Sequence, residues 1–224
     1  MKSYVFIFIF FVSMTTVMGQ SYRNTGSYNR IGIQARLLYS SIETSDLEVD
    51  GKEGFQGGFT TRGRVYNNWG LVYGIDFVSA NLSVQGTGAS QAIENQIDYG
   101  IIGAQLNILL SYNIIGQNLA IDFGPALLVN GKMKLKDNAQ GDTRIAGYTT
   151  LTGSDLEEIS TINPFAIVGL TGGFENVRLT VQYQYGLTNV LNGLNKQELD
   201  LIDPEARNFK GTASFISAGV VFYL

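Results

Sequence analysis

The sequence predicts an all-β fold, an eight-stranded antiparallel up-and-down transmembrane β-barrel with short periplasmic turns and long outward loops. Apolar and polar residues alternate along eight segments, which is the period of a strand with two different faces. The connections alternate between short and long, as in outer-membrane barrels. The last segment, "SAGVVFYL" (217–224), ends on apolar and aromatic residues, whereas most domains end on a polar tail.

The first four strands are expected at 28–40, 54–66, 69–80 and 97–112. One face of each is apolar, which suits contact with lipid or with a protein core. The apolar positions are Ile31, Ile33, Ala35, Leu37, Tyr39, Phe55, Phe59, Val65, Leu71, Tyr73, Ile75, Phe77, Ile102, Ala104, Leu106, Ile108 and Leu110. The opposite, polar face carries Gln34, Arg36, Gln56, Arg62, Arg64, Asp76, Gln105 and Asn107.

The other four strands are expected at 118–130, 163–174, 177–190 and 209–224. In the first, Leu119, Ile121 and Phe123 lie opposite Asp122. The strand at 163–174 is apolar on both faces, so its orientation stays open. In the strand at 177–190 the polar face carries Arg178, Gln182 and Gln184. The opposite face carries Leu179, Val181, Tyr183, Tyr185 and Leu187.

The connections at 67–68, 113–118 and 174–177 are short, and those at 41–53, 81–96, 131–162 and 191–208 are long and polar. Periplasmic turns of outer-membrane barrels are tight, whereas their outward loops are free to grow. Both ends of the barrel domain are therefore expected on the short-turn rim. Aromatic residues near strand ends predict interfacial girdles. These residues are Tyr28, Tyr39, Tyr66, Trp69, Tyr112, Tyr185 and Tyr223.

The two ends of the sequence predict export and barrel assembly. Lys2 and the apolar run that follows it predict a secretory signal peptide at 1–19, leaving 20–224 as one outer-membrane β-barrel domain. An uncleaved membrane anchor is the alternative. The final strand resembles the signal that the outer-membrane barrel assembly machinery engages, and it would close against the first strand. Its lipid-facing residues are Ile216, Ala218, Val220, Phe222 and Leu224.

The composition excludes several classes of function. The chain has no Cys, which rules out disulfides and a lipoprotein anchor, and no His, the usual acid or base of barrel enzymes. Its net charge of −4, or −5 after removal of residues 1–19, argues against a nucleic-acid partner. Mean hydropathy is +0.08, which fits either a soluble all-β domain or a membrane barrel.

The charged residues inside the strands predict a structural polar network in the lumen, because buried charges need partners. The network comprises Arg36, Arg62, Arg64, Asp76, Asp122, Arg178, Gln182 and Gln184. No catalytic residue, cofactor or metal ligand is expected. Asp137, Asn138 and Asp142 offer oxygen ligands for Ca²⁺, but a solvated loop explains them as well. Lys132, Lys134 and Lys136 suit either contact with lipopolysaccharide or a polar strand extension.

Two segments, 104–128 and 177–190, resemble the PorT-like outer-membrane β-barrel family. The match includes Gly124-Pro125 and the run from Tyr185 to Asn189, whereas Gln105-Leu106-Asn107 stands where the family has Pro. The resemblance implies an eight-stranded outer-membrane barrel, and family members include a component linked to type IX secretion and gliding.

Three functions are therefore open. The first is a non-enzymatic structural or interaction component of the envelope, with outer-membrane lipid, lipopolysaccharide and secretion-system proteins as partners. The second is a small pore or solute carrier, which the charged residues expected inside a narrow eight-stranded lumen disfavour. The third is a soluble periplasmic lipocalin-like binder, whose interior would be apolar and whose exterior would be polar.

Overall fold

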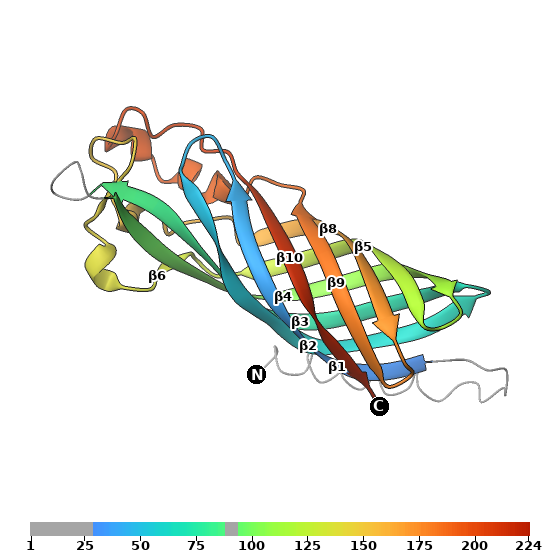
Figure 1. The fold of residues 1–224 in the computed structure, drawn as a ribbon. Helices are drawn as coiled ribbons and strands as arrows, with labels where there is room; N and C mark the ends of the chain where they lie inside the picture. The colour runs from blue at the N-terminus through green and yellow to red at the C-terminus, as the bar shows by residue number, and fades with distance from the viewer. Residues whose placement is uncertain (1–28, 88–93) are drawn as a thin grey trace, which may run out of the picture.

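A computed structural model describes residues 29–87 and 94–224 and shows a closed antiparallel barrel (Figure 1). Its long strands are β1 (Asn29–Glu43), β2 (Val49–Tyr66), β3 (Trp69–Thr87), β4 (Glu94–Ile115), β5 (Leu119–Asn130), β8 (Ile162–Gly173), β9 (Val177–Gly186) and β10 (Thr212–Tyr223). Each pairs with its neighbours in the chain, and β10 pairs with β1 from Gly32↔Tyr223 to Glu43↔Thr212. This pairing closes the ring and confirms the predicted eight-stranded up-and-down barrel.

The short turns gather at one end of the barrel, called here the turn end, and the longer connections at the other, called the loop end (Figure 1). Two-residue strands β6 (Lys134–Leu135) and β7 (Arg144–Ile145) add to β4 and β3 at the loop end. Within the described ranges, no helix has the length and apolar character to cross a membrane. The predicted signal peptide and Tyr28 lie outside those ranges.

Two of the four predicted long loops are wrong, because most of their residues belong to strands. β1 continues to Glu43 and β2 begins at Val49, so only 44–48 connect them. β3 reaches Thr87 and β4 begins at Glu94, within the range 81–96 that was expected to form a loop. The alternation that defines a strand continues through these extensions, but the apolar residues change sides.

β3 shows this change of sides most clearly. In the half of β3 nearer the turn end, Ile75 and Phe77 are about half-exposed on the outside, while Asp76 between them is buried inside. Further along the strand, the residues that point inward are apolar and fully buried. They are Val78, Ala80, Leu82 and Val84. The barrel is therefore apolar outside and polar inside toward the turn end, and apolar inside toward the loop end.

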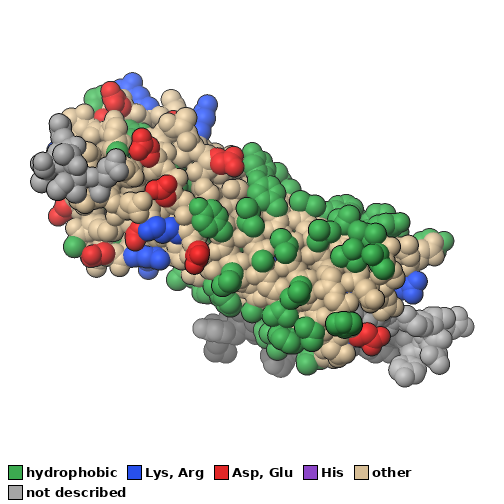
Figure 2. Space-filling view, viewed as in Figure 1, with side chains coloured by type: hydrophobic (Ala, Val, Ile, Leu, Met, Phe, Trp, Pro, Cys, Tyr) green, Lys and Arg blue, Asp and Glu red, His purple; other side chains and the backbone are tan. Residues whose placement is uncertain are grey.

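The surface follows the same division. In Figure 2, hydrophobic side chains cover much of the barrel wall toward the turn end, whereas most charged side chains in this view lie around the loop end. The hydrophobic core lies inside the loop end, where Phe165 of β8 stacks on Phe215 of β10 with ring centroids 5.0 Å apart. The extended strands enclose this core.

The connections 131–161 and 187–211 fold over the loop end and complete this core. They contain the short 3₁₀ helices η1 (Asn138–Gln140), η2 (Gly153–Leu156), η3 (Val190–Lys196) and η4 (Leu199–Leu201). The expectation of purely polar loops is therefore incomplete, since several apolar side chains from these segments are buried. They include Met133, Leu151, Leu156, Leu191 and Phe209.

Asp203 joins the two loops. Its buried carboxylate accepts hydrogen bonds from the backbone N–H groups of Thr149 at 2.6 Å and Thr150 at 2.8 Å, and from that of Glu205 at 3.1 Å. Hydrogen bonds from the Thr150 and Glu205 backbone stabilise the charged form and hold the pKa of Asp203 below its usual value.

Acid is therefore expected to loosen this contact. Because the pKa of Asp203 is lower in the folded state, its contribution to stability is present above the unfolded value of about 3.9. That contribution is lost as the pH falls through the folded pKa. Hydrogen-exchange protection factors of the Thr149 and Thr150 amides should fall between about pH 5 and about pH 2.5. In Asp203→Ala they should be low at both pH values; equal protection in the two proteins at about pH 5 would contradict the role of Asp203.

Candidate functional site

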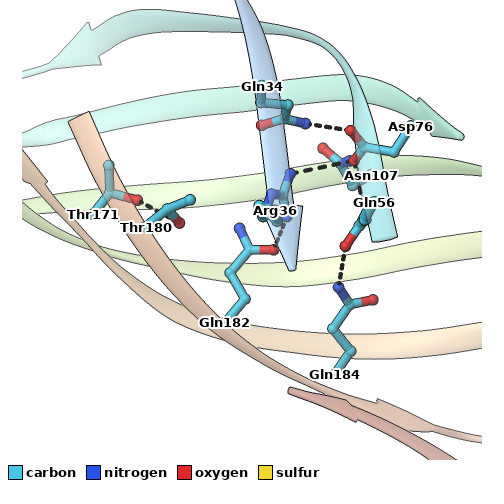
Figure 3. Close-up of polar contacts among 9 residues, drawn as sticks. All are labelled: Gln34, Arg36, Gln56, Asp76, Asn107, Thr171, Thr180, Gln182 and Gln184. Atoms are coloured by element: carbon cyan, nitrogen blue, oxygen red, sulfur yellow. Dashed lines mark hydrogen bonds and ion pairs between the residues drawn. The ribbon is translucent and has the colours of Figure 1, made fainter. Parts of the chain in front are cut away.

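The lumen near the middle of the barrel contains a polar cluster centred on Asp76, called here the middle tier (Figure 3). The Asp76 carboxylate accepts hydrogen bonds from Gln34 Nε2 at 2.6 Å, Asn107 Nδ2 at 3.0 Å and Gln56 Nε2 at 3.2 Å. Arg36 Nη2 lies 3.3 Å from Asp76 Oδ2 and forms an ion pair with it. Strands β1 to β4 thus each contribute at least one side chain, and the carboxylate is fully hydrogen-bonded.

The middle tier also reaches the opposite wall. Arg36 Nη1 donates to Gln182 Oε1 of β9, and Gln184 Nε2 of β9 donates to Gln56 Oε1 at 3.2 Å. All of these side chains are buried. The cluster therefore crosses the lumen from one wall to the other, as Figure 3 shows.

A second cluster, the lower tier, is centred on Asp122 of β5. Its Oδ2 atom lies 2.5 Å from Arg62 Nη2 and accepts a hydrogen bond of 2.5 Å from Thr171 Oγ1. Arg62 also donates from Nη1 to Ser111 Oγ at 2.5 Å and from Nε to the Tyr223 hydroxyl at 3.3 Å. Each tier thus pairs one Arg with one Asp, and neutral side chains supply most of the remaining hydrogen bonds.

The predicted lumen residues divide into two groups. Seven are buried inside the barrel, namely Arg36, Arg62, Asp76, Asp122, Arg178, Gln182 and Gln184. The prediction is wrong for Arg64, which does not join the buried network. It is exposed at the turn end, where its Nε donates to the Asn67 carbonyl at 2.9 Å. Sequence reasoning placed Ser111 on the polar face, beside Gln105 and Asn107, without assigning it to the network. It did not assign Thr171, a small polar residue in an otherwise apolar strand, and that was the available signal.

Tyr223 also differs from its prediction. It was expected in an interfacial girdle, but it is buried and its hydroxyl accepts a hydrogen bond from Arg62. The other described girdle residues are between 39% and 69% exposed; they are Tyr39, Tyr66, Trp69, Tyr112 and Tyr185. Trp69 packs against Tyr112 with ring centroids 5.0 Å apart, beside the β2–β3 turn. In the last strand Ile216, Phe222 and Leu224 point outward and are more than half exposed.

The exposed apolar belt has the height of a bilayer core. Along β9 and the residue after it, every second residue from Val177 to Leu187 is a large apolar side chain that is at least 41% exposed. Ten residue steps of about 3.3 Å, tilted by about 40° as in barrels, span roughly 25 Å. That equals the apolar band of about 25 Å typical of outer-membrane barrels.

The arrangement offers little chemistry beyond structure. Both lumen carboxylates are held by an Arg and by hydrogen-bond donors, which suits charge neutralisation inside a narrow barrel. Among the described residues, no three His, Cys, Asp or Glu side chains gather closely enough to hold a metal ion. Asp137, part of the possible Ca²⁺ set, instead caps η1 by accepting a hydrogen bond from the Ala139 N–H at 2.9 Å.

Comparisons with known proteins give similarity at the level of solved structures. No family model matches the chain, and no curated protein matches it. Neisserial surface protein A is 15% identical, with a TM-score of 0.48, and the match covers 87% of this chain and 97% of that one. Ail, the attachment invasion locus protein of Yersinia pestis, is 13% identical, with a TM-score of 0.47 and coverage of 88% and 99%. The outer membrane protein OprG from Pseudomonas aeruginosa is 14% identical, with a TM-score of 0.47 and coverage of 89% and 96%.

Proposed function

We propose that this chain is an integral outer-membrane β-barrel without catalytic activity, which acts as a structural or interaction component of the envelope. The observation that carries the proposal is that the apolar residues of the strands face outward toward the turn end and inward toward the loop end. Soluble proteins rarely expose an apolar patch larger than a few hundred Å², whereas this belt surrounds the barrel. A closed barrel leaves no unpaired strand edge, which a bilayer requires.

The belt and the lumen favour this reading over a lipocalin-like binder. A lipocalin-like barrel would be apolar inside and polar outside along its whole length. Here that pattern occurs only toward the loop end, and the other half has the opposite arrangement. The loop end would therefore project from the membrane, with the turn end in the periplasm.

The same features disfavour a pore. The middle and lower tiers fill the lumen with hydrogen-bonded side chains, and the apolar core occupies the barrel at the loop end. In planar bilayers the purified protein is therefore expected to give no steady, sized conductance steps. Reproducible steps of one size would instead support the pore or solute carrier.

The expected membrane insertion can be tested with one charge. Val181 lies at the centre of the β9 belt and is 53% exposed, so in a bilayer Val181→Arg places a charge near the midplane. This should lower the free energy of unfolding in lipid vesicles by about 2–4 kcal/mol. Leu201→Arg is the matched control, because Leu201 of η4 is 80% exposed at the loop end. Equal stability of the two variants would argue against insertion.

The proposed partners follow from the loop end and from the last strand. Lys132, Lys134 and Lys136 are exposed beside β6, a position suited to lipopolysaccharide phosphates. The outward apolar residues of β10 suit engagement by the barrel assembly machinery. The resemblance to the PorT-like family supports, as the finer proposal, a link to type IX secretion or gliding.

A pull-down from outer membranes in mild detergent tests this finer proposal. The tag belongs beside Asn138 of η1, which is exposed, because other parts of the 131–162 segment are buried in the core. Specific recovery of secretion or gliding components would support the link. Recovery of the barrel alone would contradict it and leave a stand-alone structural barrel.

A further inference from the structure

The turn end contains a cavity of about 230 Å³, called here the turn-side pocket. It lies between the β2–β3 and β4–β5 turns and the lower tier. Its charged lining residues are Arg62 and Arg64 of β2 and Arg178 of β9. Among the described residues that line it there is no Asp or Glu, and Arg62 is paired with Asp122 of the lower tier behind the lining. Amide side chains from both turns, including Asn67, Asn113 and Gln117, complete the lining.

Two of the three arginines of this pocket are buried before any ligand binds. Arg62 is buried and held by Asp122, Ser111 and Tyr223, as described for the lower tier. Arg178 is also buried. Guanidinium groups held in one orientation lose little conformational entropy when they bind an anion.

Arg64 differs because it has hydrogen-bonding capacity to spare. Its Nε donates to the Asn67 carbonyl at 2.9 Å, which holds the guanidinium beside the turn. Its two terminal nitrogens donate to no residue within the described ranges. The side chain is exposed at the mouth of the pocket, so these donors can reach a ligand from solution.

We propose that the turn-side pocket binds a phosphate group. The planar guanidinium donates two parallel hydrogen bonds to phosphate oxygens, and the neighbouring amides supply neutral donors. The volume exceeds that of a single water and lies below the ~300 Å³ at which drug-sized ligand pockets begin, which suits a small anion. This inference goes beyond the proposed function. Only the identity of the compartment that the pocket faces depends on the proposed function.

A phosphate group could come from a free solute or from a lipid headgroup. The pocket opens at the turn end, where Trp69 and Tyr112 mark the interface expected of a membrane barrel, so both sources have access. The chemistry that recognises them is the same, and the experiment must separate the sources.

Calorimetric titration of the purified protein in non-ionic detergent with inorganic phosphate tests the proposal. Wild type should show saturable binding that weakens as salt is added. Arg64→Gln should weaken binding roughly tenfold, the loss expected for one charge-assisted contact. Arg144→Gln is the matched control, because it removes an equal charge from an exposed side chain at the loop end. Binding by this control should equal that of wild type.

Nanodiscs then distinguish the two sources. If inclusion of phosphatidylglycerol in phosphatidylcholine nanodiscs abolishes phosphate binding by wild type, the headgroup occupies the pocket. If phosphate binding is equal in both nanodiscs, the pocket takes a free anion. Absence of saturable phosphate binding in detergent, or equal weakening by Arg64→Gln and Arg144→Gln, would overturn the proposal. Failure of membrane insertion in the Val181→Arg test would leave the phosphate titration in detergent unaffected.

Discussion

Asp76→Asn is expected to lower the free energy of unfolding by about 3–5 kcal/mol. The Arg36 side chain is 2% exposed and its ion pair in the middle tier is with Asp76. With the carboxylate gone, the guanidinium charge stays buried in the lumen, and the amides of Gln34, Gln56 and Asn107 lose a charged acceptor. Equilibrium urea unfolding in lipid vesicles, followed by Trp69 fluorescence, measures the change.

Two variants separate charge from side-chain size in this experiment. Asp142→Asn makes the same chemical change at an exposed position in the loop-end segment and should leave stability unchanged. The double variant Asp76→Asn with Arg36→Gln has no buried charge in the middle tier. It should be more stable than Asp76→Asn alone. If the double variant is no more stable than Asp76→Asn alone, burial of an unpaired guanidinium is not the cause of the lost stability.

Gly219→Val should disrupt closure of the barrel. Gly219 of β10 pairs with Arg36 of β1, and a Cβ atom there would lie closer than 3.0 Å to the Ala35 carbonyl oxygen and the Arg36 Cα atom. Because both contacts are with backbone, the strands must separate at the pair that closes the ring. We expect a loss of about 3 kcal/mol or more and a reduced folded fraction on unboiled SDS gels.

Ala218→Val provides the control on the neighbouring residue. Ala218 points outward from the same strand and is exposed, so an added side chain there meets no backbone. Its mobility on unboiled gels should equal that of wild type. A folded fraction of Gly219→Val equal to that of Ala218→Val would show that β10 tolerates a side chain at this position.

Much of the fold could be predicted because an eight-stranded barrel repeats one simple pattern. The orientation of β8 could not, since both faces of that segment are apolar. The structure explains why: Phe165 and Ile167 point into the loop-end core, while Val168 and Leu170 point outward. A segment that crosses from one environment to the other loses its alternation at the crossing.

The lumen network was only partly predictable. Alternation places Arg36 and Asp76 on the inner face, but the stagger of strands around the ring decides which charges meet. Alternation also gives the right answer for Tyr223, since Phe222 and Leu224 on either side point outward. Its assignment to a girdle followed from its place near a strand end, and that argument ignored the face on which it lies.

If the barrel is inserted as proposed, the change of sides along β3 would set how deep it sits in a bilayer. An outward displacement by two residues per strand would expose one ring of outward side chains, one from each of eight strands, to water. At about 1.5–3 kcal/mol for each large apolar side chain, such a shift costs on the order of 10–20 kcal/mol. An inward displacement would bury the polar outer surface of the loop end in lipid. In the proposed membrane-inserted state the barrel would thus be held at one height, with its loops at a constant distance above the membrane.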